Sequence, residues 1–302
     1  MVRFSPVELS DKAWVDEIIR LERPRSADFH FANIYIWDLS FRQEIARIGD
    51  RMVVKPKYAN HPFYAFPVGG GDLRPVIEAL HNHAGEHDFP FRIRGVTTEH
   101  IAQLEDLFPG RFEFAENRAF FDYIYSAEKL ITLSGKKLHG KRNHINRFLE
   151  DNPDWSFQPM SGDLIPACKE MLDSWELMNQ DEKHLGLERE HAAIIRAFDN
   201  FEALGLEGGV LFSGGRIVAF TIGELICGDT FNVNFEKAFP DVQGAYPMVN
   251  REFIRQVKDR HPEALYINRE DDMGRENLRK AKMSYYPEFM IEKYTATWSD
   301  NA

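Results

Sequence analysis

The sequence predicts a mixed α+β fold made of two tandem domains, each a mostly antiparallel sheet flanked by helices. Residues 208–270 show the patterns of three consecutive strands, an amphipathic helix and one more buried strand. Weaker versions of the same patterns recur in the same order in the first half of the chain. The length of 302 residues is enough for two domains that each bury their own core.

The three strands are predicted to form a meander. An apolar run at 208–212 is followed by a Gly-Gly turn and by a β-branched run at 217–225. In the third strand, 230–237, apolar and polar residues alternate. The apolar set is Phe231, Val233 and Phe235, and the polar set is Asn232, Asn234 and Glu236. A period of two predicts that each set occupies one face of the sheet.

A helix and a short strand complete this half. Pro247 suits the first turn of a helix, where its missing N–H has no intrahelical partner to lose. Apolar residues at helical spacing over 248–260 predict one stripe packed on the sheet. The run 264–268 then reads as a short buried strand.

The first half resembles a shorter copy of the second. Three positions match in order, and the separation between partners grows along the chain, as expected of a duplication with longer loops in the second copy. The matched pairs are Phe4 with Phe157, Arg51 with Arg216, and Ile93 with Ile267. We therefore predict an N-terminal domain at 1–134 and a C-terminal domain at 135–302.

Composition narrows the function classes. A formal charge of −11 and a pI near 5.5 argue against a general nucleic-acid-coating protein. Cys168 and Cys227 lie outside any CxxC pattern and are predicted to be buried thiols in a reducing compartment. The first residues lack the apolar core of a signal peptide, and no apolar run approaches the ~18 residues of a membrane helix. We predict a cytoplasmic protein without a membrane span.

A basic stretch at 135–148 marks the predicted domain junction. It holds five Lys/Arg and no acid, and as a helix it would carry an apolar packing stripe. Such a cluster can hold polyanionic phosphates, but a solvated basic helix fits equally well. The candidate phosphate-binding residues are Lys136, Lys137, Lys141, Arg142, Asn143 and Asn146.

The stretch 268–287 carries the other candidates. Asp271 and Asp272 occupy positions typical of a helix N-cap. Glu270 stands at the carboxyl end of the predicted strand, a common place for chemistry, and Tyr285 follows the predicted helix. No metal site is predicted, because no carboxylate or Cys stands out as a further ligand for the histidines at 81–87, and the segment resembles the fraying end of a helix.

These stretches resemble a known family. GKKLHGKRNHINRF at 135–148, the ending at 268–294 and the two-half layout are similar to uncharacterised bacterial proteins that share a domain with the C-terminal catalytic region of phosphatidylglycerol lysyltransferases. That family is similar in turn to Fem-type peptidyltransferases, which have tandem GNAT-like domains and use aminoacyl-tRNA. The meander, helix and strand also follow the core order of GNAT acyltransferases, although Gln243-Gly244-Ala245-Tyr246 matches their pyrophosphate loop poorly.

The resemblance implies transfer of an aminoacyl or acyl group from aminoacyl-tRNA or acyl-CoA to an amine or hydroxyl of a small molecule or peptide. Candidate proton acceptors are Glu224 and Glu236, for which a solvated strand face is the alternative interpretation, and Glu270 is a further catalytic candidate. Tyr285 is the candidate donor to the leaving group, and Asn232 and Asn234 would line the groove. The alternatives are an acyl-CoA-dependent N-acyltransferase and a non-catalytic binder of tRNA or a phosphorylated ligand.

Overall fold

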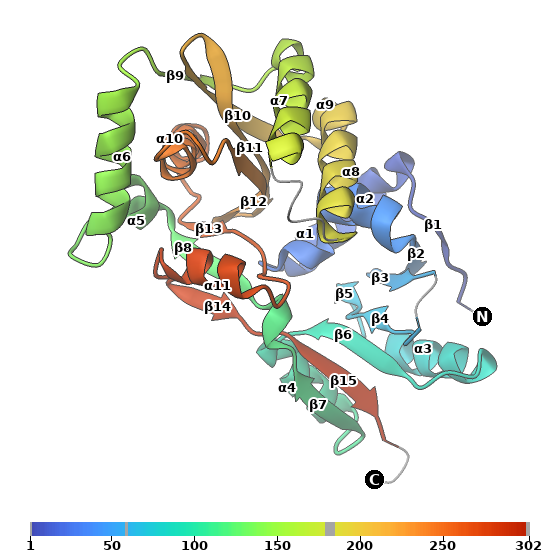
Figure 1. The fold of residues 1–302 in the computed structure, drawn as a ribbon. Helices are drawn as coiled ribbons and strands as arrows, with labels where there is room; N and C mark the ends of the chain where they lie inside the picture. The colour runs from blue at the N-terminus through green and yellow to red at the C-terminus, as the bar shows by residue number, and fades with distance from the viewer. Residues whose placement is uncertain (1, 58–59, 179–184, 300–302) are drawn as a thin grey trace. The chain divides into compact units, whose positions relative to one another are not determined.

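The computed structural model describes residues 2–57, 60–178 and 185–299, which form two compact units (Figure 1). Unit 1 contains the residues up to Asp122, Asp271–Glu276 and the residues from Met290 onward. Unit 2 contains Tyr123–Glu270 and Asn277–Phe289. The boundary predicted between residues 134 and 135 lies inside unit 2, because the preceding strand and short helix are part of that unit.

Unit 1 holds two four-stranded sheets. The first has the order β1-β2-β3-β5 and the second the order β4-β6-β15-β7. Their strands are β1 (Ser5–Pro6), β2 (Gln43–Ile48), β3 (Arg51–Pro56), β4 (Tyr64–Ala65), β5 (Val68–Gly69), β6 (Arg92–Val96), β7 (Phe112–Glu116) and β15 (Tyr294–Trp298). The helical segments are η1 (Leu9–Asp11), α1 (Lys12–Glu22), η2 (Ala27–Phe29), α2 (Phe31–Phe41), α3 (Arg74–Glu86), α4 (Thr98–Leu107) and η3 (Arg118–Phe120).

The C-terminal strand β15 pairs antiparallel with both β6 and β7, so the end of the chain completes a sheet that its first third begins. Helix α1 packs on β3 and β5, and α4 packs on β6 and β7. Arg51 and Ile93, two of the positions matched with the second half of the sequence, lie in β3 and β6.

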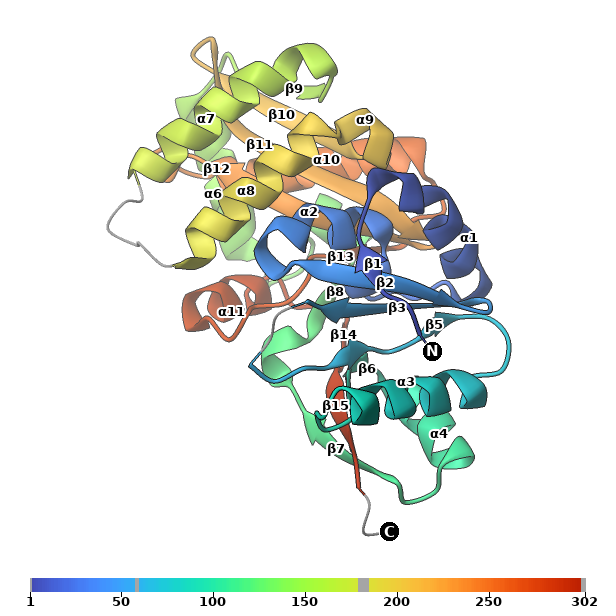
Figure 2. The same cartoon turned by 90° about the vertical axis from the view of Figure 1, so that its right-hand side faces the viewer.

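Unit 2 is built on a sheet with the order β14-β8-β13-β12-β11-β10-β9 (Figures 1 and 2). Its strands are β8 (Asp122–Ser126), β9 (Ser156–Pro159), β10 (Glu207–Ser213), β11 (Arg216–Cys227), β12 (Thr230–Ala238), β13 (Tyr266–Asn268) and β14 (Phe289–Ile291). The helical segments are α5 (Ala127–Thr132), α6 (His139–Asp151), η4 (Gly162–Leu164), α7 (Ile165–Met178), α8 (Leu185–Asp199), α9 (Phe201–Leu204), α10 (Ala245–Arg260) and α11 (Glu276–Met283).

The predicted meander, helix and returning strand are confirmed as β10–β12, α10 and β13. Helix α10 buries Val249, Phe253, Ile254 and Val257 against the sheet, as the helical spacing requires. The mixed α+β class is confirmed as well. Within the described ranges, no helix combines the length and apolarity needed to cross a membrane.

Two features of β12 shape the site. Strand β12 pairs in parallel with β13 only over Thr230–Asn232 in the part of the chain that the structure describes, so its second half leaves β13. It also contains a β-bulge: Ile222 of β11 lies opposite Phe235 and Gly223 opposite Val233, which leaves Asn234 as the extra residue. A one-residue bulge reverses the alternation of side chains beyond it.

The predicted face assignment of 231–236 is therefore wrong beyond Asn234. Phe231 packs against Phe253 of α10, with ring centroids 5.6 Å apart, which defines the α10 face of the sheet. Beyond the bulge Glu236 emerges on this same face and accepts a hydrogen bond from Asn250 of α10. Asn232 and Asn234 remain on the opposite face.

Candidate functional site

The candidate site lies in unit 2, where β12 leaves β13. Helix α6, strand β12, helix α10, the residue after β13 and the segment after α11 each contribute one polar side chain to it. We call this group the β12–β13 cluster; it consists of Lys141, Glu236, Asn250, Arg269 and Tyr285.

A buried ion pair forms the centre of the β12–β13 cluster. Arg269 Nη2 donates to Glu236 Oε1 over 2.9 Å, and the two side chains are only 14% and 8% exposed. Asn250 Nδ2 donates to the other carboxylate oxygen over 2.8 Å. Burial opposes the charge of Arg269, but Glu236 and the nearby tyrosines outweigh it, so the pKa of Arg269 lies above its ordinary value. The guanidinium is thus a fixed cation.

Two cations lie close to the ring of Tyr285. Lys141 Nζ is 4.0 Å from the centroid of its ring, and Arg269 Cζ is 5.0 Å from it. Burial raises the pKa of Tyr285, so its hydroxyl keeps the proton at neutral pH and can donate it. Burial and the charge of Arg269 lower the pKa of Lys141, while Glu236 opposes that shift.

The guanidinium of Arg269 also forms a side-chain hydrogen bond with Tyr285. Its Nη1 is buried and, among the described residues, has no acceptor in hydrogen-bonding geometry. A buried N–H without a partner is costly, so such a group in a native protein calls for an explanation. An oxygen acceptor on a ligand, such as a carbonyl that becomes an oxyanion, would satisfy it.

A second polar group lies on the opposite face of the sheet. Glu270 accepts hydrogen bonds from Asn232 Nδ2 (2.9 Å) and Asn234 Nδ2 (3.3 Å), and its N–H donates to Asn268 Oδ1. Its φ of 56° is in the left-handed region, a strained conformation for a residue other than glycine. Glu224 lies directly opposite Asn232 in the ladder and therefore shares this face.

The structure thus separates the predicted catalytic carboxylates. Glu224 and Glu270 lie with both asparagines on one face, whereas Glu236 joins Arg269 on the α10 face. Neither Glu224 nor Glu236 is on a solvated strand face, because Glu224 Oε1 is buried and Glu236 is in the buried ion pair.

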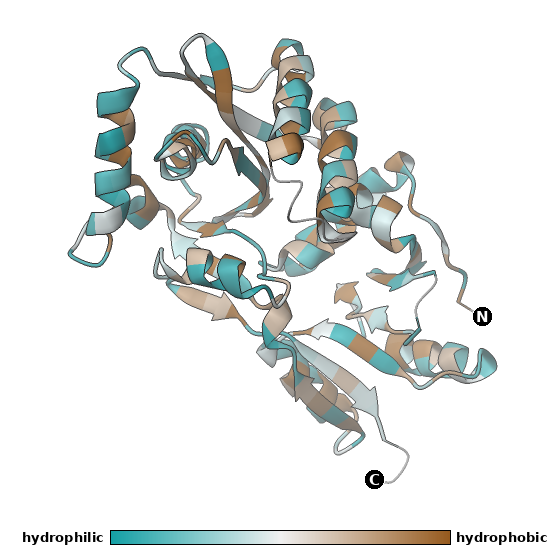
Figure 3. Cartoon of the chain, viewed as in Figure 1, coloured by the Kyte–Doolittle hydropathy of each residue, from teal (hydrophilic) through white to brown (hydrophobic). Residues whose placement is uncertain are grey.

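The predicted basic helix is confirmed as α6, which is mostly hydrophilic in Figure 3 and buries Ile145 and Phe148. Its candidate residues differ in their surroundings. Lys141 belongs to the β12–β13 cluster, and Lys137 Nζ is 5.2 Å from the ring centroid of Tyr286.

Arg142 has a structural contact at the end of α5. Its guanidinium donates to the carbonyl oxygens of Leu133 and Gly135, the latter over 2.8 Å. The remaining predicted residues, Lys136, Asn143 and Asn146, are exposed.

The predicted N-cap at Asp271 and Asp272 is wrong, because α11 begins only at Glu276. Met273 and Gly274 have φ values of 49° and 72°, and this left-handed backbone forms a turn instead of a first helical turn. Asp272 accepts from the N–H of Gly274 and pairs with Arg118.

Two members of the β12–β13 cluster were missed as site residues in the sequence. Arg269 is the first residue after β13 and reaches Glu236 on the α10 face, whereas Glu270, at a left-handed φ of 56°, turns to the other face. Asn250 is a polar residue in the buried stripe of α10, with 2% exposure. The sequence signal that could have identified Asn250 is an amide side chain within the apolar stripe of a helix, because a buried amide needs a hydrogen-bond partner.

The family of this chain is identified by comparison with known protein families and solved structures. The family model for the C-terminal part of phosphatidylglycerol lysyltransferase matches residues 20–297. The crystal structure of a conserved protein of unknown function from Bacteroides thetaiotaomicron VPI-5482 is 40% identical, with a TM-score of 0.93 over 99% of this chain and 100% of that one.

One further structure and one further sequence are similar to this chain. FemX is 8% identical, with a TM-score of 0.62 over 97% of this chain and 96% of that one, which shows a shared fold and confirms the predicted tandem GNAT-like class. An uncharacterized protein of Mycoplasmoides gallisepticum is 25% identical over 175 residues. These cover 57% of this chain and 54% of that protein, so the match spans about half the length of this relative.

Proposed function

We propose that this chain, which belongs to the family of the C-terminal domain of phosphatidylglycerol lysyltransferases, transfers an aminoacyl group from an activated donor to an amine or hydroxyl. The observation that carries the proposal is the buried Arg269, held by Glu236 and with one N–H unused, beside a protonated Tyr285. We further propose aminoacyl-tRNA as the donor. The expected cytoplasmic location fits this donor.

The cluster can supply the steps that acyl transfer needs. When the acceptor attacks the ester carbonyl, negative charge develops on the carbonyl oxygen, and Nη1 of Arg269 is the donor that stabilises it. Lys141 adds a second positive charge nearby. Because Arg269 is already ordered by Glu236 and Asn250, little reorganisation is needed as the charge develops.

Tyr285 can carry the proton that moves from the attacking group to the leaving oxygen. As the carbon–oxygen bond to the donor breaks, the tyrosine gives its proton to the leaving oxygen and regains one from the attacking amine or hydroxyl. The proton count balances, and the products are the new amide or ester and the free hydroxyl of the donor. Glu236 acts here as a positioning residue, because both of its oxygens are already hydrogen-bonded.

The exposed residues before and along α6 would contact the phosphates of the donor. Lys136, Lys137, Asn143 and Asn146 present donors beside Lys141 in a chain whose formal charge is −11. A local positive surface on an acidic protein attracts polyanions at low salt and loses them as salt rises.

The proposal is tested by a transfer assay with the full chain. Radiolabelled aminoacyl-tRNA and labelled acyl-CoA are each offered with a pool of amines, hydroxyl compounds and phosphatidylglycerol vesicles, and label appearing in a new product is counted. Tyr285→Phe, which keeps the ring, should lower turnover from aminoacyl-tRNA about 100-fold. Lys141→Gln should also lower it.

Lys169→Gln is the matched control for Lys141→Gln. Lys169 is on α7, outside α6 and the β12–β13 cluster, and pairs with Asp199, so its loss should leave turnover unchanged. Transfer from acyl-CoA alone would refute the donor assignment. Salt-dependent tRNA binding without transfer from either donor would refute the enzyme and leave a binding protein.

A further inference from the structure

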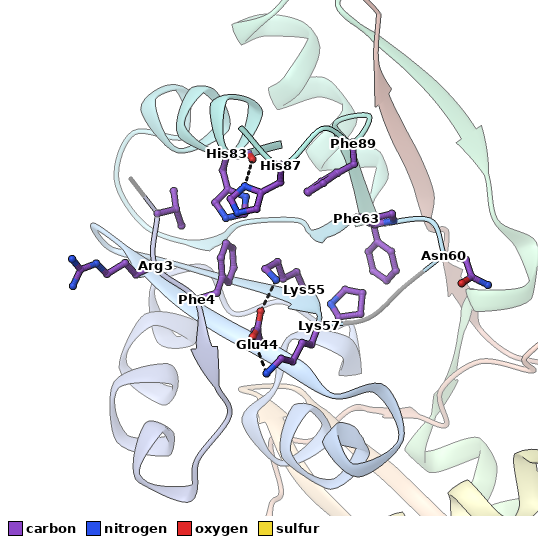
Figure 4. Close-up of a pocket in the computed structure, with 13 residues that line it drawn as sticks. Arg3, Phe4, Glu44, Lys55, Lys57, Asn60, Phe63, His83, His87 and Phe89 are labelled. Atoms are coloured by element: carbon purple, nitrogen blue, oxygen red, sulfur yellow. Dashed lines mark hydrogen bonds and ion pairs between the residues drawn. The ribbon is translucent and has the colours of Figure 1, made fainter. Parts of the chain in front are cut away.

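A separate pocket lies entirely within unit 1 (Figure 4). Its volume is about 820 Å³, within the range of ~300–1,000 Å³ that small-molecule sites occupy. The first residues of the chain, β2, β3, the segment before β4 and the end of α3 contribute its walls. The mechanism proposed for unit 2 uses none of these residues.

The charged side chains in this pocket are mostly basic. Arg3, Lys55 and Lys57 line it together with a single acid, Glu44. The Glu44 carboxylate bonds Lys55 Nζ over 2.5 Å and lies 3.8 Å from Lys57 Nζ. Three basic side chains and one carboxylate among the lining residues give the pocket wall a net positive charge, although the chain as a whole is acidic.

His83 adds a hydrogen-bond donor at the rim, and His87 packs against it. Tyr64 OH lies 2.6 Å from His83 Nδ1, and burial raises the pKa of Tyr64, so the tyrosine donates and a neutral His83 carries its proton on Nε2. The ring of His87 stacks on that of His83 with centroids 4.1 Å apart, and its Nδ1 donates to the carbonyl oxygen of His83. Both rings are therefore fixed in orientation.

Aromatic rings form the remaining walls. Phe4, Phe63 and Phe89 line the pocket and are half-buried, and Figure 4 shows them around the same space as the lysines and histidines. Arg94 Cζ is 4.1 Å from the ring centroid of Phe63, so a cation already stacks on that ring. Half-exposed aromatic rings are surfaces on which a planar ring can stack.

We propose that this pocket binds a nucleoside phosphate, with the base against Phe63 and Phe89 and the phosphate near Lys55 and Lys57. Cations beside aromatic rings are the combination that such a ligand requires, because its two ends differ in charge and in polarity. Neither adenosine nor inorganic phosphate alone would use both kinds of wall.

Calorimetric titration of the full chain tests this proposal. Adenosine monophosphate should bind saturably at one site, and adenosine and inorganic phosphate should each bind at least tenfold more weakly. Lys57→Gln and Phe63→Leu should each weaken adenosine monophosphate at least tenfold; the leucine keeps an apolar side chain and removes the ring. Lys12→Gln, on α1 and outside the pocket, is the matched control and should change nothing.

Each contrary result would overturn a defined part of the proposal. Absence of saturable binding at millimolar nucleotide would overturn the proposal, as would unchanged affinity in both pocket variants. Inorganic phosphate binding as tightly as the nucleotide would overturn the assignment of the aromatic walls. Thermal unfolding of each variant verifies that a loss of binding does not come from a loss of fold.

Discussion

The ion pair between Glu236 and Arg269 gives the sharpest test of the β12–β13 cluster. Glu236→Gln keeps the size of the side chain and an oxygen for Arg269, but it removes the negative charge. Two unit charges about 4 Å apart interact by about 4 kcal/mol at the effective dielectric constant of a protein, ~20. A hydrogen bond from a charged donor to the new amide retains about 1.5–3 kcal/mol of this. We therefore expect a loss of about 2 kcal/mol in the free energy of unfolding.

Urea unfolding at neutral pH measures this loss. Glu150→Gln is the control, because Glu150 is 69% exposed and its pair with Arg147 is long, at 3.9 Å. An exposed pair of this kind contributes at most about 1 kcal/mol, so the control should unfold almost as the unchanged protein does. The difference between the two substitutions isolates the effect of burial.

The same substitution has a second consequence at Lys141. Burial and Arg269 already lower the pKa of Lys141, and the charge of Glu236 opposes them. Removing that charge should lower the pKa of Lys141 further, so its ammonium loses its proton at a lower pH. NMR titration of the methylated lysine can follow this shift. An unchanged or higher pKa, or an unfolding free energy within 0.5 kcal/mol of the unchanged protein, would refute the geometry of the cluster.

Three further substitutions test contacts inside each unit: His30 and Lys293 in unit 1, and Gly223 in unit 2. Burial lowers the pKa of His30 from 6.5 to about 4, so the unfolded chain binds a proton there first and stability falls as pH drops through that window. His30→Gln should remove about 2–3 kcal/mol of the loss between pH 7 and pH 4.5 in urea unfolding; an identical pH slope would contradict it. Lys293→Met removes a 2% exposed ammonium bonded to Asp122 and should cost about 3–5 kcal/mol, with Asp122→Asn restoring part of it in a double-mutant cycle. Gly223→Ala would place a Cβ 2.1 Å from a backbone oxygen of β12 and should cost about 1–3 kcal/mol, whereas Gly228→Ala, with no atom within 4 Å, should stay within about 0.5 kcal/mol in thermal unfolding; equal losses would show that the clash is relieved.

The elements that the sequence predicted correctly are those whose signal is local. Helix α10 follows from apolar residues at helical spacing and from Pro247 in its first turn, and α6 follows from an apolar stripe within a basic run. The pairing of strands that are far apart in the sequence leaves no comparable local pattern. Nothing in the residues of β15 specifies β6 and β7 as partners, and its pairing places the end of the chain in unit 1.

The composition of the site depends on one irregularity that strict alternation hides. Without the bulge at Asn234, Glu236 would lie with Asn232 near Glu270, and Arg269 would have no carboxylate on the α10 face. The sequence did carry a trace of it, because Gly223 interrupts a β-branched strand and an isolated glycine there is typical of a bulge or a close backbone approach. The partner strand crowds the position where a Cβ would be, so glycine is what allows the strands to meet there. The bulge thus divides one run of polar residues between two faces, and the half that meets Arg269 becomes the candidate site.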